Sequence, residues 1–195
     1  MMMGVADTQL VIGGMIRLQD SRPLVTINTT FDFIRPGVIG GWLEGSTCVI
    51  RSTRNTVFAE SLMTVDGETA LRASGIFRRS DLPPLELDAF LCDRAEPREV
   101  PRGEANPPDG FREVKIPGEF LAVNGPLHLD LTDDPAHLGL RIEDRHCNSS
   151  GIYHGGALMM LADIHHAAGS KIQTSQLEFL PRIHFACECL QPVRT

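Results

Sequence analysis

The first 80 residues alternate between apolar and polar positions in a pattern that predicts one helix followed by four strands. Residues 1–18 are mostly small and apolar and predict the helix. Asp66-Gly67 predicts a tight hairpin turn, because both residue types tolerate a positive φ. The four predicted strands are residues 24–34, 41–51, 56–65 and 69–79. We therefore expect residues 1–80 to form a β-meander preceded by a helix.

The first predicted strand alternates regularly along its whole length. Successive side chains of a strand point to opposite faces of the sheet, so every second residue shares one face. The side chains expected together on one face are Val25, Ile27, Thr29, Phe31 and Phe33.

The rest of the chain changes character twice. Residues 81–118 are rich in proline and charged residues, and this composition predicts a linker. Residues 119–172 predict a second folded part with two strands, a polar loop that contains glycines, and a helix over residues 157–172. Its two predicted strands lie within residues 120–131 and 138–143. Residues 173–195 contain apolar stretches but receive no assignment.

The composition limits the classes of protein to which the chain can belong. Its 195 residues are 42% hydrophobic and 22% charged, which suits one packed domain or one domain with part of another. A formal net charge of -7 argues against a nucleic-acid partner, because phosphate binding needs a local excess of Lys and Arg. No apolar run approaches the roughly 20 residues that span a bilayer, so no membrane partner is expected.

The cysteines indicate a reducing compartment. They are five in number, an odd count without a dense framework, and this favours free thiols in the cytoplasm. The apolar N-terminus has no basic leader and is a poor signal peptide. Cys187, Cys189 and His184 are close in sequence, but three such residues do not complete a tetrahedral zinc site. The sequence therefore predicts a cytoplasmic protein with no metal and no organic cofactor.

Two of the predicted helical segments resemble each other. Residues 1–7 match residues 157–163 at an offset of 156 positions, which aligns Asp7 with Asp163. Two helices rich in small residues can be alike through composition alone, and a tandem duplication is the alternative explanation. Residues 173–195 do not match residues 17–39 convincingly.

Residues 146–163 read His-Cys-Asn-Ser-Ser-Gly-Ile-Tyr-His-Gly-Gly-Ala-Leu-Met-Met-Leu-Ala-Asp. This segment resembles the signature of hotdog-fold acyl-CoA thioesterases of the phenylacetic-acid-degradation type, in which Asn, Gly and His-Gly-Gly precede an Asp on the next helix. Residues 23–79 resemble the later half of the same domain through the segments 23–26, 31–36 and 73–77. The order differs from the family, because the later half comes first here.

The resemblance implies an α+β hotdog fold, in which an antiparallel sheet wraps around a long central helix, here with its halves in swapped order. Such domains usually pair, with their sheets joined edge to edge and active sites at the helix–helix interface. Three arrangements fit the reversed order: a permuted domain, halves exchanged between the chains of a homo-oligomer (dimer or tetramer), or a piece of a longer tandem protein.

The resemblance also implies hydrolysis of an acyl-CoA thioester, with an aromatic or medium-chain acyl group, to free acid and CoA. A glycine-rich loop that enters a helix presents unpaired N–H groups and the positive end of the helix dipole. We therefore expect the Gly155 N–H, with that of Gly156, to contact the thioester and stabilise the developing oxyanion. Asp163 lies two helical turns beyond Gly156 on the same face and is the expected general base or nucleophile. For the two glycines the alternative is an ordinary helix start. For Asp163 it is a carboxylate that pairs with a neighbouring side chain.

Four further residues are candidates. Asn148 can orient the water or the thioester, or shape the loop through an Asx turn. The resemblance implies that His154 orients the loop rather than acting as a base, and that Thr26 occupies a hydroxyl position that holds water in relatives. Asp7 could serve a site whose loop is residues 148–156, in this chain or in a partner, or be frayed and inert near the terminus.

Two other functions remain open at this level. A non-catalytic hotdog module would bind acyl-CoA or mediate assembly, and the divided halves favour it. A hotdog dehydratase would need a catalytic histidine paired with an acidic residue, and no such pair is apparent in the sequence.

Overall fold

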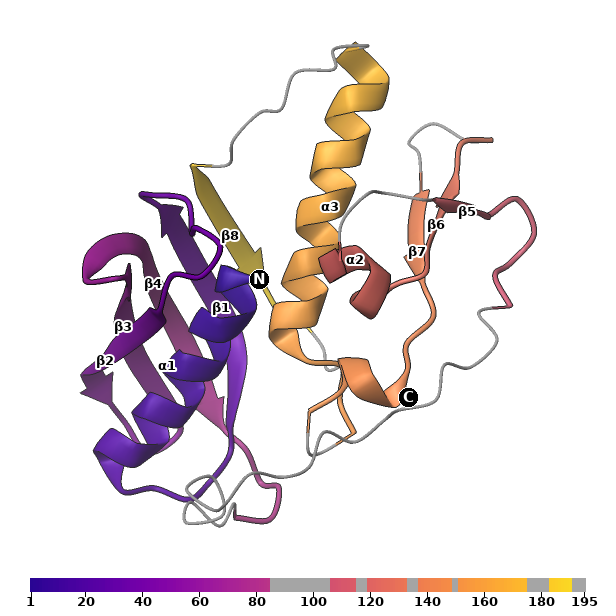
Figure 1. Cartoon of the computed structure of the whole chain (residues 1–195). Coiled ribbons are helices and arrows are strands. Elements are labelled where there is room, and N and C mark those ends of the chain that lie inside the picture. The colour runs from indigo at the N-terminus through magenta and orange to yellow at the C-terminus, as the bar shows by residue number, and fades with distance from the viewer. Residues whose placement is uncertain (85–105, 115–118, 133–136, 149–150, 175–182, 191–195) are drawn as a thin grey trace. The chain divides into compact units, whose positions relative to one another are not determined.

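The structure is a computed structural model that describes residues 1–84, 106–114, 119–132, 137–148, 151–174 and 183–190 (Figure 1). The chain divides into two compact units. The first unit consists of Met2–Glu96 together with Pro181–Gln191, and the second consists mainly of Pro97–Leu180. The chain therefore leaves the first unit, forms the second, and returns to add a segment to the first.

The first unit is one helix packed on an antiparallel sheet of five strands in the order β2-β3-β4-β1-β8. Every strand pairs antiparallel with its neighbours. The elements of this unit are α1 (Met2–Leu18), β1 (Leu24–Phe33), β2 (Leu43–Ser52), β3 (Thr56–Val65), β4 (Glu68–Arg79) and β8 (His184–Glu188). The helix and the four strands expected in residues 1–80 are thus present.

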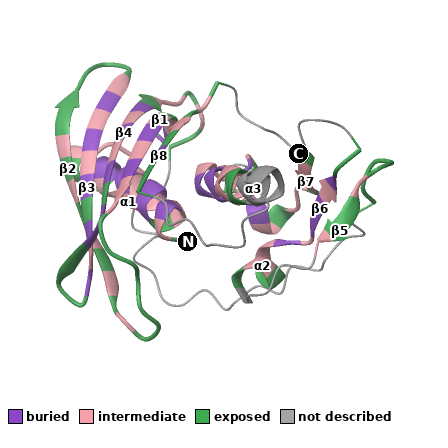
Figure 2. Cartoon of the chain, turned by 90° about the horizontal axis from the view of Figure 1, so that it is seen from above, coloured by how far each residue is buried: buried purple, intermediate pink, exposed green. Residues whose placement is uncertain are grey.

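Alternation along the strands creates the core of the first unit. Each second residue of β3 is buried, and the same face of β1 and β4 is buried beside it, as the purple bands of Figure 2 show. Helix α1 covers this face with its own apolar residues, including Leu10 and Met15. The largest fully buried side chains of the strands are Phe31, Phe77, Met63, Leu71 and Val57.

The turn between β3 and β4 has the conformation that its sequence predicts. Asp66 has a φ of 52° and Gly67 a φ of 82°. Two consecutive positive φ values give the backbone twist that matches paired strands, and glycine adopts this conformation without steric cost.

The prediction that Val25 and Ile27 share a face with Phe31 was wrong. Strand β1 contains an irregularity between Thr26 and Asn28, where Ile27 has no partner in the register with β4. One extra residue reverses the faces on the two sides of a bulge. As a result Ile27 is 40% exposed, and Thr26 instead lies on the face covered by α1.

The unassigned C-terminal segment supplies the edge strand β8. It pairs with β1 so that Phe185 lies opposite Phe31, with their ring centroids 6.4 Å apart. The His184 Nδ1 lies 2.8 Å from the Asp32 Oδ1 on the exposed face of the same strand pair. This strand was missed because its partner is about 150 residues away and its own five residues carry only a short apolar signal.

Strand β8 follows α3 (Gly155–Thr174) in the chain as β1 follows α1. The offset of 156 positions that relates the two helices places residues 184–188 of β8 opposite residues 28–32 of β1, although the two segments share no identical residue.

The second unit contains α3 and a three-stranded antiparallel sheet in the order β5-β6-β7. Its other elements are β5 (Arg112–Val114), α2 (Glu119–Asn124), β6 (Leu127–Asp130), β7 (His137–Leu140) and the short 3₁₀ helix η2 (Asp144–His146). The strand expected over residues 120–131 is therefore half helix, because a short apolar run fits either conformation. Residues 112–114 of the expected linker form a strand, and residues 85–105 and 115–118 lie outside the described residues.

None of the helices in the described ranges combines the length and the apolar character needed to cross a bilayer.

Candidate functional site

Asp7 is a buried carboxylate in the first unit, with only 4% of its surface exposed. The Thr26 Oγ1 donates a hydrogen bond to the Asp7 Oδ1 at 3.0 Å. This contact depends on the β1 bulge, which turns the Thr26 hydroxyl toward α1. The fold of the first unit thereby brings together two candidate site residues that are 19 positions apart in the sequence.

Helix α1 is held firmly around Asp7. The Gln9 Nε2 donates hydrogen bonds to the Gly45 carbonyl at 3.1 Å and to the Thr47 Oγ1 at 3.2 Å. The Thr47 hydroxyl in turn donates to the Gln9 carbonyl at 3.0 Å. Asp7 is therefore not frayed, because the next turn of the helix is fastened to strand β2.

The thiols of Cys187 in β8 and of Cys189 just after it lie close enough to Asp7 for its charge to affect their pKa values. Burial raises the pKa of the Cys187 thiol, and the Asp7 carboxylate raises it further. Burial, with the neighbouring Cys187 and Asp7, raises the pKa of Cys189 to about 12. Both thiols are therefore protonated at neutral pH and are poor nucleophiles. Their proximity to Asp7 could not be read from the sequence, because it depends on the pairing of β8 with β1.

The loop before α3 in the second unit is built on His146, which is 2% exposed. The Glu143 N–H donates to His146 Nδ1 at 3.0 Å, so Nε2 carries the proton and donates to the Asn124 carbonyl at 3.1 Å. Burial is the main cause that lowers the pKa of His146, and the ring is neutral at physiological pH. The His154 N–H donates to the His146 carbonyl at 2.8 Å and anchors the other end of the loop.

Asn148 closes the tip of this loop. Its N–H donates to the Ile152 carbonyl at 2.8 Å, and its Oδ1 accepts the Ile152 N–H at 3.1 Å. Gly151 completes the turn with a φ of 68°. The Asn148 amide oxygen thus shapes the loop, while the residue itself is exposed.

His154 engages the first turn of α3. Its Nδ1 accepts the Gly156 N–H at 3.0 Å, and its carbonyl accepts the N–H groups of Ala157 at 2.9 Å and Leu158 at 3.1 Å. These contacts are those of a residue that orients the loop. The Gly156 N–H is therefore occupied, and no hydrogen bond is found for the Gly155 N–H among the described residues. Gly155 is the donor that the helix start leaves available.

Asp163 lies on α3, two turns beyond the loop, and is half-buried, whereas Asp7 is buried. Met159 and Met160 on the same helix are buried. The site residues proposed from sequence thus fall into two sets, which the structure describes separately. The first unit holds Asp7 and Thr26, and the second holds Asn148, His154, Gly155, Gly156 and Asp163.

No group of three or more His, Cys, Asp or Glu side chains in the described part of the chain is arranged to hold a metal ion.

Tyr153 gives a stability test of this loop. Its hydroxyl is buried without a hydrogen-bond partner in the described structure, and burial together with Cys147 raises its pKa to about 12. We expect Tyr153→Phe to increase the free energy of unfolding by about 1 kcal/mol, because the change removes an unsatisfied polar group and leaves no cavity. Urea denaturation measures the change, with Tyr153→Leu as a control that is destabilised by lost packing. Destabilisation of the Tyr153→Phe variant by more than 1 kcal/mol would show that the hydroxyl has a partner.

Comparison with known proteins identifies the fold. No family model matches the sequence, and no curated protein matches it either. Among solved structures, a proposed thioesterase from Novosphingobium aromaticivorans aligns with 97% of this chain and 70% of its own, at 12% identity and a TM-score of 0.59. An acyl-CoA thioesterase II from Mycobacterium marinum aligns with 98% of this chain and 73% of its own, at 12% identity and a TM-score of 0.54. A protein of unknown function with a hotdog fold from Alicyclobacillus acidocaldarius aligns with 96% of this chain and 66% of its own, at 14% identity and a TM-score of 0.55.

The chain has the hotdog fold. The alignments extend through both compact units, since each covers at least 96% of the chain. At identities of 12–14%, they show the fold of this hotdog chain rather than its activity. The chain spans 50–60% of the length of four further matched structures, which include a thioesterase from Thermus thermophilus with coenzyme A and zinc at 23% identity, 32% coverage of this chain and a TM-score of 0.29.

Proposed function

We propose that this hotdog chain has acyl-CoA thioesterase activity, in which water cleaves the thioester to a free carboxylic acid and CoA. The observation that carries the proposal is the buried Asp7 carboxylate with the Thr26 hydroxyl 3.0 Å from it. A buried acid in an apolar helix is costly to retain, and such groups are concentrated at functional sites.

Asp7 and Thr26 suit the activation of water. The Asp7 carboxylate can accept a proton from an attacking water or can itself attack the thioester carbon. The Thr26 hydroxyl donates to Asp7 and retains lone pairs that can accept a hydrogen bond from the same water. The neighbouring thiols of Cys187 and Cys189 are protonated, so the carboxylate is the stronger candidate for the nucleophile or base.

In the second unit, taken by itself, the Gly155 N–H is the proposed donor to a thioester carbonyl oxygen. It lies at the positive end of the α3 dipole, and His154 takes the next N–H, that of Gly156. A donor of this kind stabilises the transition state by roughly 3–4 kcal/mol when it is aimed at the oxyanion. Asn148 and His154 hold the loop that presents it.

The internal similarity favours Asp7 over Asp163 as the acid. We propose that α1–β1 and α3–β8 are equivalent parts of two hotdog copies, because the two helices match at an offset of 156 positions and a strand follows each of them. At this offset Thr26 aligns with Arg182, so the copy that contains Asp163 lacks the hydroxyl. Asp163 is also less buried than Asp7.

A panel of acyl-CoA thioesters tests the activity. We expect the full chain to release CoA thiol, detected with a chromogenic thiol reagent, from at least one aromatic or medium-chain member. We also predict the acyl preference, a homo-oligomeric state and a cytoplasmic location. Light scattering tests the homo-oligomeric state. Folded protein that releases no thiol from any member of a panel from acetyl-CoA to aryl-acyl-CoA would reject the activity.

The alternative is a hotdog module that binds acyl-CoA or mediates assembly without turnover. The specific observation in its favour is that the Asn148 Oδ1 and the Gly156 N–H are already occupied within the loop. Calorimetry with an acyl-CoA distinguishes the two functions, because saturable binding without thiol release indicates the module.

A further inference from the structure

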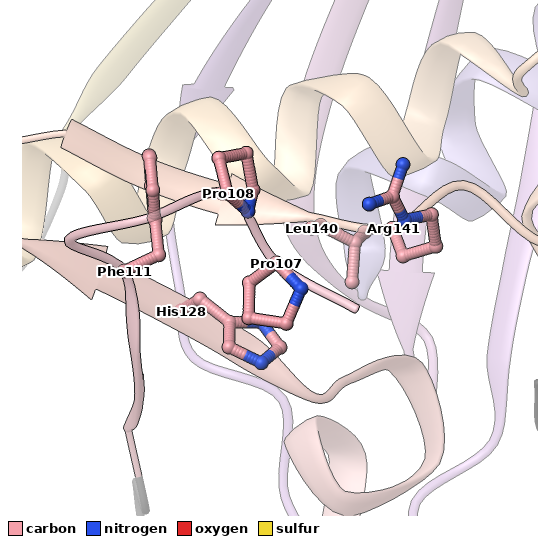
Figure 3. A pocket seen from close by; sticks show the side chains of 7 residues that line it. Pro107, Pro108, Phe111, His128, Leu140 and Arg141 are labelled. Carbon is pink, nitrogen blue, oxygen red and sulfur yellow. The ribbon is translucent and has the colours of Figure 1, made fainter. Parts of the chain in front are cut away.

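A pocket of about 200 Å³ lies in the second unit, on one face of strands β6 and β7 (Figure 3). Its lining is largely apolar, with two polar side chains among the apolar ones. The lining side chains are Pro107, Pro108, Phe111, Leu140, His128 and Arg141. None of these residues belongs to the proposed thioesterase site, so the pocket is a separate candidate for ligand binding.

The register of the small sheet leaves room for this pocket beside His128. His128 on β6 pairs with Gly139 on β7, and the Phe111 ring lies over that glycine. A Cβ atom on residue 139 would come within 2.9 Å of the ring. Glycine at this position therefore allows the Phe111 ring and the His128 imidazole to line the same space.

His128 is the unusual residue of the lining. It borders the pocket although only 6% of its surface is exposed. No hydrogen bond of its imidazole is found among the described residues, whereas buried polar groups are nearly always paired. A buried imidazole without a protein partner at the wall of an open space indicates a hydrogen-bonding ligand or a water there.

The charges around the pocket disfavour an ionic ligand of either sign. Glu113 lies directly opposite His128 on β5, and Asp130 lies two residues further along β6 on the same face. Arg141 in the lining is cationic, and its guanidinium already donates to the Asn106 carbonyl. An anion would face the two carboxylates and a cation would face the guanidinium, and like charges placed together lower affinity.

We propose that this pocket binds an uncharged phenol, with its ring against Phe111 and the two prolines and its hydroxyl hydrogen-bonded to His128. A phenol hydroxyl both donates and accepts, so it can pair with either tautomer of the imidazole. The size agrees, because a cavity of about 150 Å³ accommodates benzene and a phenol adds only one oxygen atom. The site is independent of the proposed thioesterase activity.

Protein-observed NMR of the full chain tests this site with phenol as the probe. We expect phenol to shift the His128 imidazole signal saturably at concentrations below about 10 mM. The signal is assigned through its absence from the spectrum of His128→Leu. Benzoate and benzylammonium should bind at least tenfold more weakly than phenol, because each of these ions meets a like charge at the pocket.

Variants separate the hydrogen bond from the apolar contacts, with affinities measured by ligand-observed NMR. His128→Leu should lower the ratio of phenol affinity to toluene affinity at least fivefold, since toluene makes no hydrogen bond. Gly139→Ala should weaken both ligands, because the added methyl group displaces the Phe111 ring that forms a wall. His166→Leu, which replaces an exposed histidine of the same unit, is the matched control and should leave the ratio unchanged.

Three results would overturn the site. The first is no saturable shift of the His128 signal up to about 10 mM phenol, which is also the result expected if the imidazole holds only a water. The second is binding of benzoate or benzylammonium as tight as that of phenol. The third is an unchanged ratio of phenol to toluene affinity in His128→Leu with wild-type circular dichroism. If that variant unfolds, the first two measurements still decide, because they use the wild-type chain.

Discussion

Replacement of Asp7 by asparagine is expected to lower kcat for acyl-CoA hydrolysis about 10³-fold, because the amide cannot take a proton from water or attack the thioester. The change preserves the shape of the side chain, and the amide oxygen can still accept the Thr26 hydroxyl hydrogen bond. The free energy of unfolding should therefore change much less than the activity. Thiol release from the best acyl-CoA of the panel, with urea denaturation of the same preparation, measures both effects.

The controls for this experiment separate the two acids. Asp81→Asn removes an exposed carboxylate of the same unit and should retain wild-type kcat. Thr26→Val should lower kcat about tenfold, since it removes the hydroxyl at nearly constant volume. If Asp163→Asn loses activity while Asp7→Asn keeps it, the assignment of Asp7 is wrong and the half-buried acid of α3 is the reactive one.

Truncation of Phe31 to alanine is expected to lower the free energy of unfolding by about 3–5 kcal/mol. The ring is fully buried on β1, the strand between β4 and β8 in the first unit's sheet. Its strand pairs with β4 through Ala73 and with β8 through Phe185, whose ring is 6.4 Å away. The truncated side chain would leave a cavity between the sheet and α1 and would remove the aromatic contact that secures the edge strand.

The matched control for Phe31→Ala is Phe120→Ala, which truncates a phenylalanine that is 38% exposed on α2 and should cost much less. Urea denaturation followed by far-ultraviolet circular dichroism measures both variants. Hydrogen exchange of the β8 amides should accelerate in Phe31→Ala and not in Phe120→Ala. A loss below 1 kcal/mol for Phe31→Ala would contradict the packing described for the first unit.

Local sequence patterns predicted much of this architecture. The apolar periodicity of residues 1–80 predicted α1 and four strands, because a buried face imposes a regular spacing on a single segment. Asp66-Gly67 predicted its turn, since the required positive φ values restrict the residue types. The glycine pair before residue 157 predicted a helix start with an available N–H, and Gly155 begins α3.

The residues that the local patterns misplaced depend on distant partners. Ile27 was assigned to the wrong face because the bulge is set by the register between β1 and β4, which no alternation within β1 reveals. Residues 120–131 contain both a helix and a strand. Only tertiary packing decides which part adopts which conformation, since a short apolar run is compatible with a helix and with a strand. Gly156 was a second candidate donor beside Gly155, and only the structure shows that the His154 ring accepts its N–H.

The sequence by itself therefore determined the helix and meander of the first unit, and it supplied the candidate site residues as a prediction. Only the tertiary structure decided that β8 completes the first sheet, that Thr26 faces Asp7, and that Cys187 lies near that carboxylate. The physical reason is the range of the interactions. Periodicity and turn conformation are encoded within about ten neighbouring residues, whereas strand pairing joins Phe31 to Phe185 across more than 150 positions of the chain.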